Sequence, residues 1–254
     1  MTDLHARADV LRALHVPGRP LLLPNAWDAA SARQVAAAGL PAVATSSAAV
    51  AESLGWADGE AAPAQVVLDA LARIAAAVEV PVTADMERGY GLRPAELVER
   101  LAEAGAVGCN LEDSLPGDGR LLDVEEQFDF LSAVRAAADA AGTGLVLNAR
   151  IDTWLRPSDT TSEERLAQTV ARARRYREAG ADCVYPILLA DRGTIRRLVA
   201  EADVPVNIIA QGPAADLRSL ADLGVARISF GAQLFRAQQA RLAEELDRLA
   251  ADLG

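Results

Sequence analysis

Short apolar segments alternate with longer segments that carry apolar residues at helical spacing along most of this chain. The alternation predicts eight strands, each followed by a helix. The predicted strands are residues 21–25, 42–46, 82–87, 108–113, 145–151, 183–188, 206–210 and 227–230. The predicted helices are residues 29–38, 63–78, 94–104, 124–141, 162–179, 192–202, 213–223 and 233–253.

Glycine marks the ends of several predicted helices. Four of them end in a glycine just before the next strand, at Gly39, Gly105, Gly180 and Gly224. Glycine at that place favours the left-handed conformation that closes a helix. A further helix is predicted over residues 2–15. Eight strand–helix units in 254 residues predict one α/β domain, 1–254, folded as a closed (β/α)8 (TIM) barrel with an N-terminal helix.

Composition narrows the possible functions. The net charge of −11 argues against a nucleic-acid partner. No apolar segment approaches membrane-spanning length, so we expect no membrane partner. The N-terminus lacks a signal-peptide pattern, and Cys109 and Cys183 lie in apolar strand-like segments. These features predict a cytoplasmic protein with reduced, buried thiols.

Two residue types are scarce. All 25 basic residues are arginine, so an enzyme that forms a Schiff base through lysine is excluded. The two histidines, His5 and His15, both lie in the predicted N-terminal helix. A histidine-rich zinc site or a serine–histidine triad in the main body is therefore not expected.

Polar residues collect where the predicted strands end. The active sites of such barrels lie at the C-terminal ends of the strands. The polar residues at this rim are Asn25, Trp27, Asp28, Thr45, Ser46, Ser47, Asp85, Glu87, Asn110, Glu112, Asp113, Asn148, Arg150, Asp152, Tyr185, Asn207, Gln211 and Ser229. Their coincidence on several strands predicts an active site at the rim.

Strand alternation assigns faces to these side chains. Asp85 and Glu87 are predicted to share one face of their strand, with Met86 on the other. Asn110 and Glu112 share a face of the next strand, which places Cys109 beneath a helix. Arg150 would be the one cation among these acids. It either forms an ion pair with one of them or binds a substrate carboxylate or phosphate through two hydrogen bonds, and we favour the second role.

The acids form a set of oxygen donors. Asp85, Glu87 and Glu112 have no histidine or cysteine among them, which favours a hard cation such as Mg²⁺ or Mn²⁺. Such a cation would hold a 2-oxo acid by its carboxylate and keto oxygens. It would also stabilise the enolate that forms when a neighbouring bond breaks.

Five motifs carry a resemblance to a known family. They are Asn25-Ala-Trp-Asp28, Thr45-Ser-Ser-Ala48, Thr83-Ala-Asp-Met-Glu-Arg-Gly-Tyr-Gly91, Asn110-Leu-Glu-Asp-Ser114 and Asn148-Ala-Arg-Ile-Asp152. In this order they resemble the isocitrate lyase/phosphoenolpyruvate mutase superfamily, in its short, mutase-like branch. The likeness continues through Gly180-Ala-Asp182 and Pro205-Val-Asn207, and so covers nearly the whole chain.

The resemblance implies a specific site. Mg²⁺ would be held by Asp85, with Glu87, Glu112 and Asp58 nearby through water. Arg150 and the backbone amides around Ser46, Ser47 and Ala48 would bind the carboxylate of a small 2-oxo or 2-hydroxy acid. The family also implies homodimers or homotetramers, in which the last helix is often exchanged between subunits.

The segment 114–124 departs from the family pattern. The resemblance implies a mobile active-site loop there, and the lyases carry a Lys-Lys-Cys-Gly-His motif whose cysteine is the general acid. This chain has no cysteine, lysine or histidine in the segment, and it also lacks the asparagine of the mutases. Asp118 and Arg120 are the only polar candidates, and solvated loop charges are the more economical interpretation.

Three further residues have open roles. Tyr185 is a candidate acid or hydrogen-bond donor, or a core tyrosine with a satisfied hydroxyl. Trp27 either lines the pocket or plugs the rim, and Asn207 is a candidate for substrate binding. Asp113 and Asp152 are candidates for orienting Arg150 and the waters of the metal.

Three functions are compatible with these observations. The leading hypothesis is a Mg²⁺-dependent lyase or decarboxylase that acts on a small 2-oxo or 2-hydroxy carboxylic acid through a metal-stabilised enolate. The second is a phosphoenolpyruvate/phosphonopyruvate-type mutase that rearranges a P–C bond. The third is a non-catalytic paralogue that binds a small acid.

Overall fold

The computed structural model describes residues 4–117, 119–155, 159–212 and 216–252. Its strands are β1 (Leu21–Leu23), β2 (Asn25–Ala26), β3 (Val43–Thr45), β4 (Val82–Asp85), β5 (Gly108–Glu112), β6 (Val146–Ile151), β7 (Cys183–Pro186), β8 (Asn207–Ile209) and β9 (Arg227–Ser229). Its helices are α1 (Leu4–Ala13), α2 (Ala29–Ala37), α3 (Ser47–Ser53), α4 (Ala64–Ala75), α5 (Pro94–Glu103), α6 (Val124–Ala140), α7 (Ser162–Glu178), α8 (Arg192–Glu201), α9 (Leu217–Ala221) and α10 (Gln233–Ala251).

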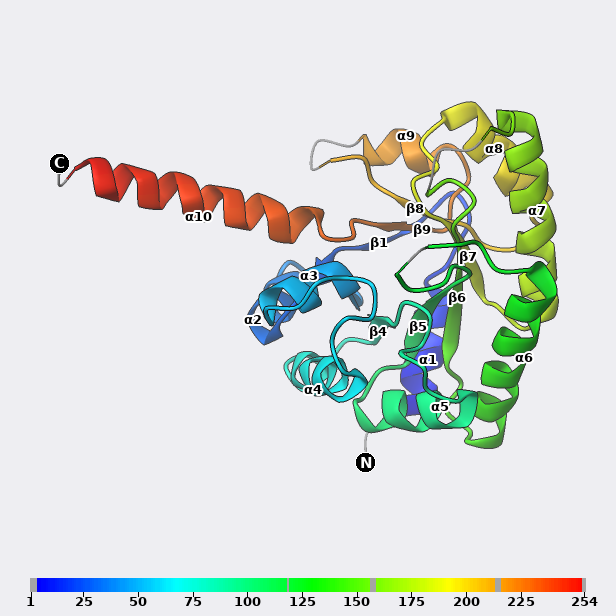
Figure 1. Ribbon diagram of the computed structural model, residues 1–254, viewed down its shortest axis with the longest axis horizontal. Helices are drawn as coiled ribbons and strands as arrows, with labels where there is room; N and C mark the ends of the chain where they lie inside the picture. The colour runs from blue at the N-terminus through cyan, green and yellow to red at the C-terminus, as the bar shows by residue number, and fades with distance from the viewer. Residues whose placement is uncertain (1–3, 118, 156–158, 213–215, 253–254) are drawn as a thin grey trace.

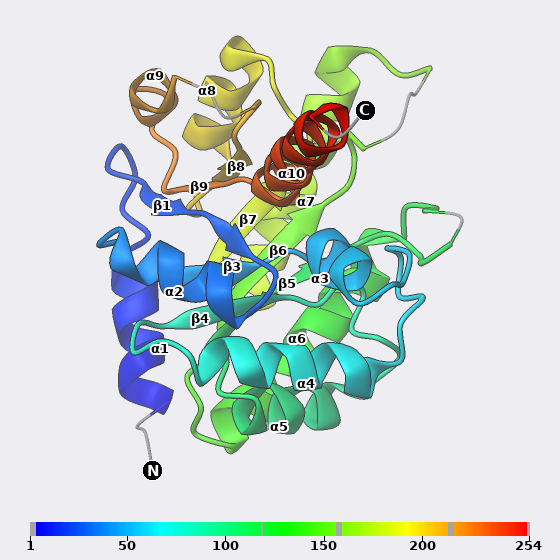
Figure 2. The same ribbon diagram turned by 90° about the vertical axis from the view of Figure 1, so that its left-hand side faces the viewer.

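The strands form a closed parallel barrel, which confirms the predicted fold. One sheet has the order β2-β3-β4-β5-β6-β7 and the other β1-β9-β8, and all of their pairings are parallel. β1 and β2 are two parts of one strand interrupted at Pro24, and a bridge between Val184 and Val206 joins the two sheets on the other side. The strands lie at the centre of the molecule with helices around them (Figure 2).

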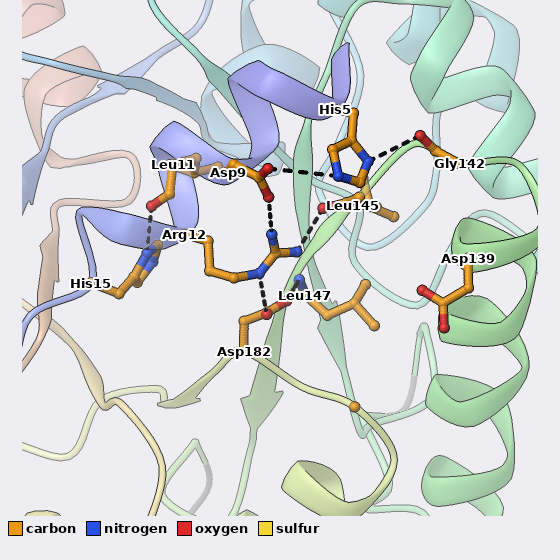
Figure 3. Close-up of polar contacts among 12 residues, drawn as sticks. His5, Asp9, Leu11, Arg12, His15, Asp139, Gly142, Leu145, Leu147 and Asp182 are labelled. Atoms are coloured by element: carbon orange, nitrogen blue, oxygen red, sulfur yellow. Dashed lines mark hydrogen bonds and ion pairs between the residues drawn. The ribbon is translucent and has the colours of Figure 1, made fainter. Parts of the chain in front are cut away.

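Helix α1 closes the N-terminal end of the barrel. Leu11 is fully buried in a cluster with residues at the starts of the strands, such as Leu21 and Val146. A side chain at position 108 would come within 2.9 Å of Leu11, so only glycine leaves room for the helix. Polar contacts hold the helix in place from the side: Arg12 lies between Asp9 and Asp182, 2.8 Å from an oxygen of the latter (Figure 3).

The predicted glycine caps are present. Gly39, Gly105, Gly180 and Gly224 have φ values between 78° and 94°, in the left-handed region. At Gly180 a side chain would also come within 2.7 Å of Arg135, so the close approach adds a second reason for glycine.

Several elements differ from the sequence-based prediction. The predicted strand 82–87 ends at Asp85, and the segment after Thr45 forms the short helix α3 rather than a loop. The sequence pattern did not reveal α3, although Ser46 is a good helix cap and its hydroxyl accepts a hydrogen bond from the amide of Ala49. Of the predicted helix 213–223, the structure shows α9, which begins after the cap residue Asp216 and ends at Ala221; residues 213–215 lie outside the described part.

The last helix stands apart from the barrel. α10 projects away from the rest of the molecule (Figure 1), and three of its leucines, Leu242, Leu246 and Leu249, are 52–55% exposed. Within the described ranges, no helix combines the length and apolar character that a bilayer crossing requires.

Candidate active site

The predicted acids and the arginine meet at the C-terminal ends of β4, β5 and β6. The register places Asp85 beside Asn110, and Glu112 beside Arg150. Neighbouring strands bring these side chains to one rim because each lies at or next to the end of its strand. Glu112 is only 8% exposed, so the charges at this rim interact with little water between them.

Arg150 forms ion pairs with two carboxylates. Its Nη1 contacts Glu112, while Nε and Nη2 donate to the two oxygens of Asp152 at 2.7 and 3.1 Å. Asp152 also accepts a hydrogen bond from the hydroxyl of Ser114. Of the two roles weighed for Arg150, the structure shows the ion pair, and it shows Asp152 orienting the guanidinium as expected. The role in binding a substrate carboxylate stays a prediction.

Asp113 supports this arrangement from behind and does not touch Arg150. Its carboxylate accepts hydrogen bonds from Arg172 at 3.0 Å, from the hydroxyl of Tyr176 at 2.7 Å, and from the amide of Asp152 at 2.8 Å. It is fully buried. Asp113 therefore fixes the backbone of Asp152 and acts on Arg150 only through that residue, while its role in orienting the waters of a metal stays a prediction.

Asp85 is the most accessible of the acids at the strand ends. One oxygen accepts hydrogen bonds from the amide and hydroxyl of Ser47, at 3.1 and 3.0 Å. The other oxygen accepts a hydrogen bond of 3.4 Å from the side-chain nitrogen of Asn110. Asp58 approaches from the loop after α3; partial desolvation and the charge of Asp85 raise its pKa, and a hydrogen bond from Ser47 opposes this.

Strand alternation did not predict the backbone conformation that directs Glu87 toward the site. It follows the end of β4 and has a left-handed backbone, with φ of 48°. Tyr90 donates its hydroxyl proton to one oxygen of Glu87 at 2.5 Å, and the amide of Glu60 donates to the other at 2.9 Å. Burial, and then the charges of Asp58, Asp85 and Glu60, raise the pKa of Glu87 to about 7 despite the bond from Tyr90.

Glu60 and Tyr90 were missed by the sequence analysis. Glu60 accepts hydrogen bonds from the backbone amides of Arg88 and Tyr90, at 2.9 and 2.7 Å, and so fastens the loop after α3 to the loop after β4. Glu60 and Tyr90 both have positive φ, of 59° and 55°. The glycines beside them at positions 59, 89 and 91 were the only sequence signal for such backbone turns.

The charge balance of the rim is strongly negative. Burial raises the pKa of Glu112; Arg150 opposes this, while Asp152, Asp85 and Glu87 add to it. For Arg150, burial disfavours the charge, but Asp152 and Glu112 outweigh it and raise its pKa. One guanidinium thus faces several carboxylates.

These residues fit a hard divalent cation. All of the donors are carboxylate, amide or hydroxyl oxygens, which Mg²⁺ prefers, and the crowded negative charge would be relieved by a cation. Within the described part of the chain, no three carboxylate, histidine or thiol side chains converge closely enough to form a ready-made cage. Mg²⁺ keeps several waters, so a site for it does not need three carboxylates in direct contact.

The remaining predicted residues lie around this centre. Tyr185 is beside Arg150 in the register and is buried in the barrel; burial raises its pKa to about 12. Asn207 lies inside the barrel, where its oxygen accepts a hydrogen bond from Ser229 at 3.2 Å. Neither has a described contact with the carboxylates.

Trp27 and Ala48 pack against the first turn of α10. The ring of Trp27 meets that of Phe235 edge to face at 5.3 Å, and Ala48 packs on the same cluster. Trp27 also borders a groove between α2 and α10. No acid of the rim lines that groove, so the packing favours the role of a rim plug for Trp27.

The loop after β5 forms a short turn. Ser114 pairs with Leu121, and the amide of Leu115 donates to the oxygen of Arg120 at 2.9 Å. Asp118 lies outside the described residues. Whether this segment, 114–124, moves over the site stays a prediction.

The two cysteines take no part in the site. Both are fully buried, and burial raises the pKa of each to about 12. They are therefore inert thiols at neutral pH, as expected.

Comparison with known proteins shows which families and structures this chain is similar to. Residues 11–250 match the family model described as phosphoenolpyruvate phosphomutase. A crystal structure of a proposed phosphonomutase from Burkholderia cenocepacia J2315 is 43% identical, with a TM-score of 0.90, and the match covers 95% of this chain and 99% of that one.

Two curated proteins extend the comparison. A functionally uncharacterised protein of Mycobacterium tuberculosis H37Rv is 36% identical over 220 residues, 86% of this chain and 80% of its own. The 2-methylisocitrate lyase of Salmonella typhimurium LT2 is 29% identical over 216 residues, 80% of this chain and 70% of its own.

Proposed function

The chain belongs to the isocitrate lyase/phosphoenolpyruvate mutase superfamily, and on this premise we propose that it is a Mg²⁺-dependent lyase or decarboxylase. Its substrate would be a small 2-oxo or 2-hydroxy carboxylic acid. The observation that carries the proposal is the rim where Arg150 forms ion pairs with Glu112 and Asp152 and is influenced by the charge of Asp85. Such a site offers one anion-binding group beside a set of oxygen donors for a cation.

Arg150 is proposed to bind the substrate carboxylate. Asp152 holds Nε and Nη2 of the guanidinium, so its plane is fixed before substrate arrives. Glu112 contacts Nη1 and would have to give up that contact, or share it, when a carboxylate binds. The amides at the start of α3, around Ser46, Ser47 and Ala48, would supply further donors to the same carboxylate.

Asp85 is proposed to hold the cation, with Asp58, Glu87 and Glu112 linked to it through water. When bound, Mg²⁺ or Mn²⁺ supplies positive charge where the negative charge of an enolate develops. The chain's own part is to keep these carboxylates in place, which Ser47, Tyr90 and Glu60 do through the hydrogen bonds described above.

The segment 114–124 has no cysteine, lysine or histidine to serve as the proton donor, so a residue outside it is proposed. Tyr185 is proposed for this role. Its raised pKa keeps the hydroxyl protonated at neutral pH, and it neighbours Arg150 in the register.

A metal-supplemented screen tests the proposal. Purified protein would be assayed with oxaloacetate, methylmalate, citrate-like acids and phosphono acids, with Mg²⁺ and with a chelator. We expect turnover of a carboxylic acid that Asp85→Asn abolishes, without a change in circular dichroism. Asp129→Asn, on the exposed side of α6, is the matched control and should retain activity. Turnover that survives both Asp85→Asn and exhaustive chelation would refute the proposal.

A P–C bond mutase is the alternative, and the 43% identity to the proposed phosphonomutase favours it. The same cation and arginine would serve that reaction. Phosphorus NMR with phosphoenolpyruvate and phosphonopyruvate separates the two functions, because only the mutase interconverts C–O–P and C–P signals. Tight binding without product from any acid would instead indicate a non-catalytic paralogue.

A homo-oligomer is also proposed. The exposed leucines of α10, on a helix that leaves its own barrel, support an exchange of this helix between the subunits of a dimer or tetramer.

A further inference from the structure

Among the residues that the structure describes, Arg227 is a buried charge without an acidic partner. It lies on β9, inside the barrel, and is 1% exposed. Its Nε and Nη1 have no hydrogen-bond partner in the described ranges, and Nη2 donates to the side-chain oxygen of Asn110 at 3.2 Å. Burying an unpaired charge costs several kcal/mol. A sequence that retains one beside a reaction centre is expected to use it.

The contact with Asn110 sets the direction of an amide. A guanidinium can only donate hydrogen bonds, so the atom of Asn110 that faces Arg227 must be the oxygen. The nitrogen of that amide must then face the other way, toward Asp85, which lies 3.4 Å from it. With the reverse orientation, the amide oxygen would lie against the carboxylate and repel it.

Asn148 contacts the same oxygen but cannot set its direction. Its nitrogen donates to Asn110 at 2.8 Å, while its own oxygen has no partner within the part of the chain that the structure describes. An amide with one free end can turn over at little cost, and it then presents an acceptor in place of a donor. Arg227 has no such alternative state.

We propose that Arg227 is a positioning residue that acts through Asn110 to hold Asp85 ready for a divalent cation. The inference rests on the proposed function, in which Asp85 is the direct metal ligand. It adds a link that runs from β9, through β5, to β4. Groups that orient metal ligands in this way contribute about 10- to 100-fold to metal affinity.

Mn²⁺ binding to the full-length protein, followed by electron paramagnetic resonance, tests this link without any substrate. Arg227→Met removes the charge and all donors, and we expect it to weaken Mn²⁺ binding by about 10-fold or more. Arg227→Lys keeps a group that can only donate, and should bind within about 3-fold of the wild type. Asn148→Ala is the matched control, because it removes the other donor to Asn110 and should also stay within about 3-fold.

A double-mutant cycle distinguishes the link from a direct effect of charge. Asn110→Ala should weaken Mn²⁺ binding as Arg227→Met does, and the double variant should be no weaker than either. Circular dichroism and melting curves establish which variants fold. If Arg227→Met does not fold, the Mn²⁺ affinities of Asn110→Ala and Arg227→Lys still test the link.

The outcomes distinguish a failure of the link through Arg227 from a failure of the proposed metal site at Asp85. Additive losses in the cycle, or Arg227→Met within 3-fold of the wild type, would overturn the inference alone. If Arg227→Met does not fold, normal Mn²⁺ binding by the Asn110→Ala variant would also overturn the inference. If the wild type does not bind Mn²⁺, or binds it as well after Asp85→Asn, the metal site itself falls, and this link with it.

Discussion

Replacement of Glu87 by glutamine in the metal-free protein should change how stability depends on pH. The ordinary pKa of this carboxyl group is 4.5, and burial beside other acids raises it to about 7 in the folded protein. Between these values the folded state keeps a proton that the unfolded chain has released. Stability therefore falls as pH rises from 4.5 to 7, and the loss is complete above pH 7.

The size of the effect follows from the two pKa values. At about 1.4 kcal/mol for each pH unit, the wild type should lose about 3 kcal/mol of unfolding free energy through ionisation of Glu87. Glutamine does not ionise and avoids this loss. It keeps an acceptor for Tyr90 but turns a nitrogen toward the amide of Glu60, which adds a pH-independent cost of about 1–2 kcal/mol.

Urea unfolding in a chelating buffer at pH 5, 6, 7 and 8 measures the effect. The difference in unfolding free energy between Glu87→Gln and the wild type should shift by about 3 kcal/mol in favour of the variant from pH 5 to pH 8. The matched control, Glu99→Gln on the exposed side of α5, changes the net charge equally. A pH-independent difference for Glu87→Gln, or the same shift for Glu99→Gln, would refute the assignment of the raised pKa to this site.

Three further predictions concern other parts of the molecule. His15→Phe should make the protein more resistant to acid than the wild type. Burial lowers the pKa of His15 from 6.5 to about 4, so the wild type loses up to about 3 kcal/mol of unfolding free energy as pH falls through that range. Urea unfolding at pH 4.5 and 7 measures this loss. Leu246→Glu on α10 should lower the molar mass measured by light scattering without unfolding the barrel, because the charge would enter the proposed interface. Arg150→Lys should raise KM by about 10- to 100-fold for the acid that the screen identifies, with a smaller effect on kcat, because lysine cannot bind a carboxylate in the bidentate manner.

Each of these has a control and a contrary result. His5→Phe, at the exposed end of α1, controls for loss of a histidine, and equal acid sensitivity of His15→Phe and the wild type would contradict the first prediction. Ala251→Glu adds a charge to the other side of α10, and an unchanged molar mass for Leu246→Glu would exclude the helix from an interface. An unchanged KM for Arg150→Lys would remove the guanidinium from substrate binding.

Local patterns were sufficient for the barrel and for the gathering of the polar residues at one rim. The alternation of apolar strands and amphipathic helices, with Gly39 and Gly105 as caps, depends on residues close together in the chain, and hydrophobic burial enforces it strongly. Strand alternation likewise assigned Asn110 and Glu112 to one face and Cys109 to the other. The roles of Arg150, Asp85 and the loop 114–124 in catalysis remain predictions, since they depend on ligands.

Only the tertiary structure decided which polar groups pair with one another. The choice of Glu112 as a partner of Arg150 and the contact between Arg227 and Asn110 depend on side chains from different strands, and the left-handed turn that carries Glu87 inward is held by contacts with Glu60 and Tyr90. The contact between Arg227 and Asn110 joins residues 117 positions apart. Hydrogen bonds and ion pairs depend steeply on distance and direction, so they are settled by the packed arrangement of the strands, which the order of residues along the chain does not display.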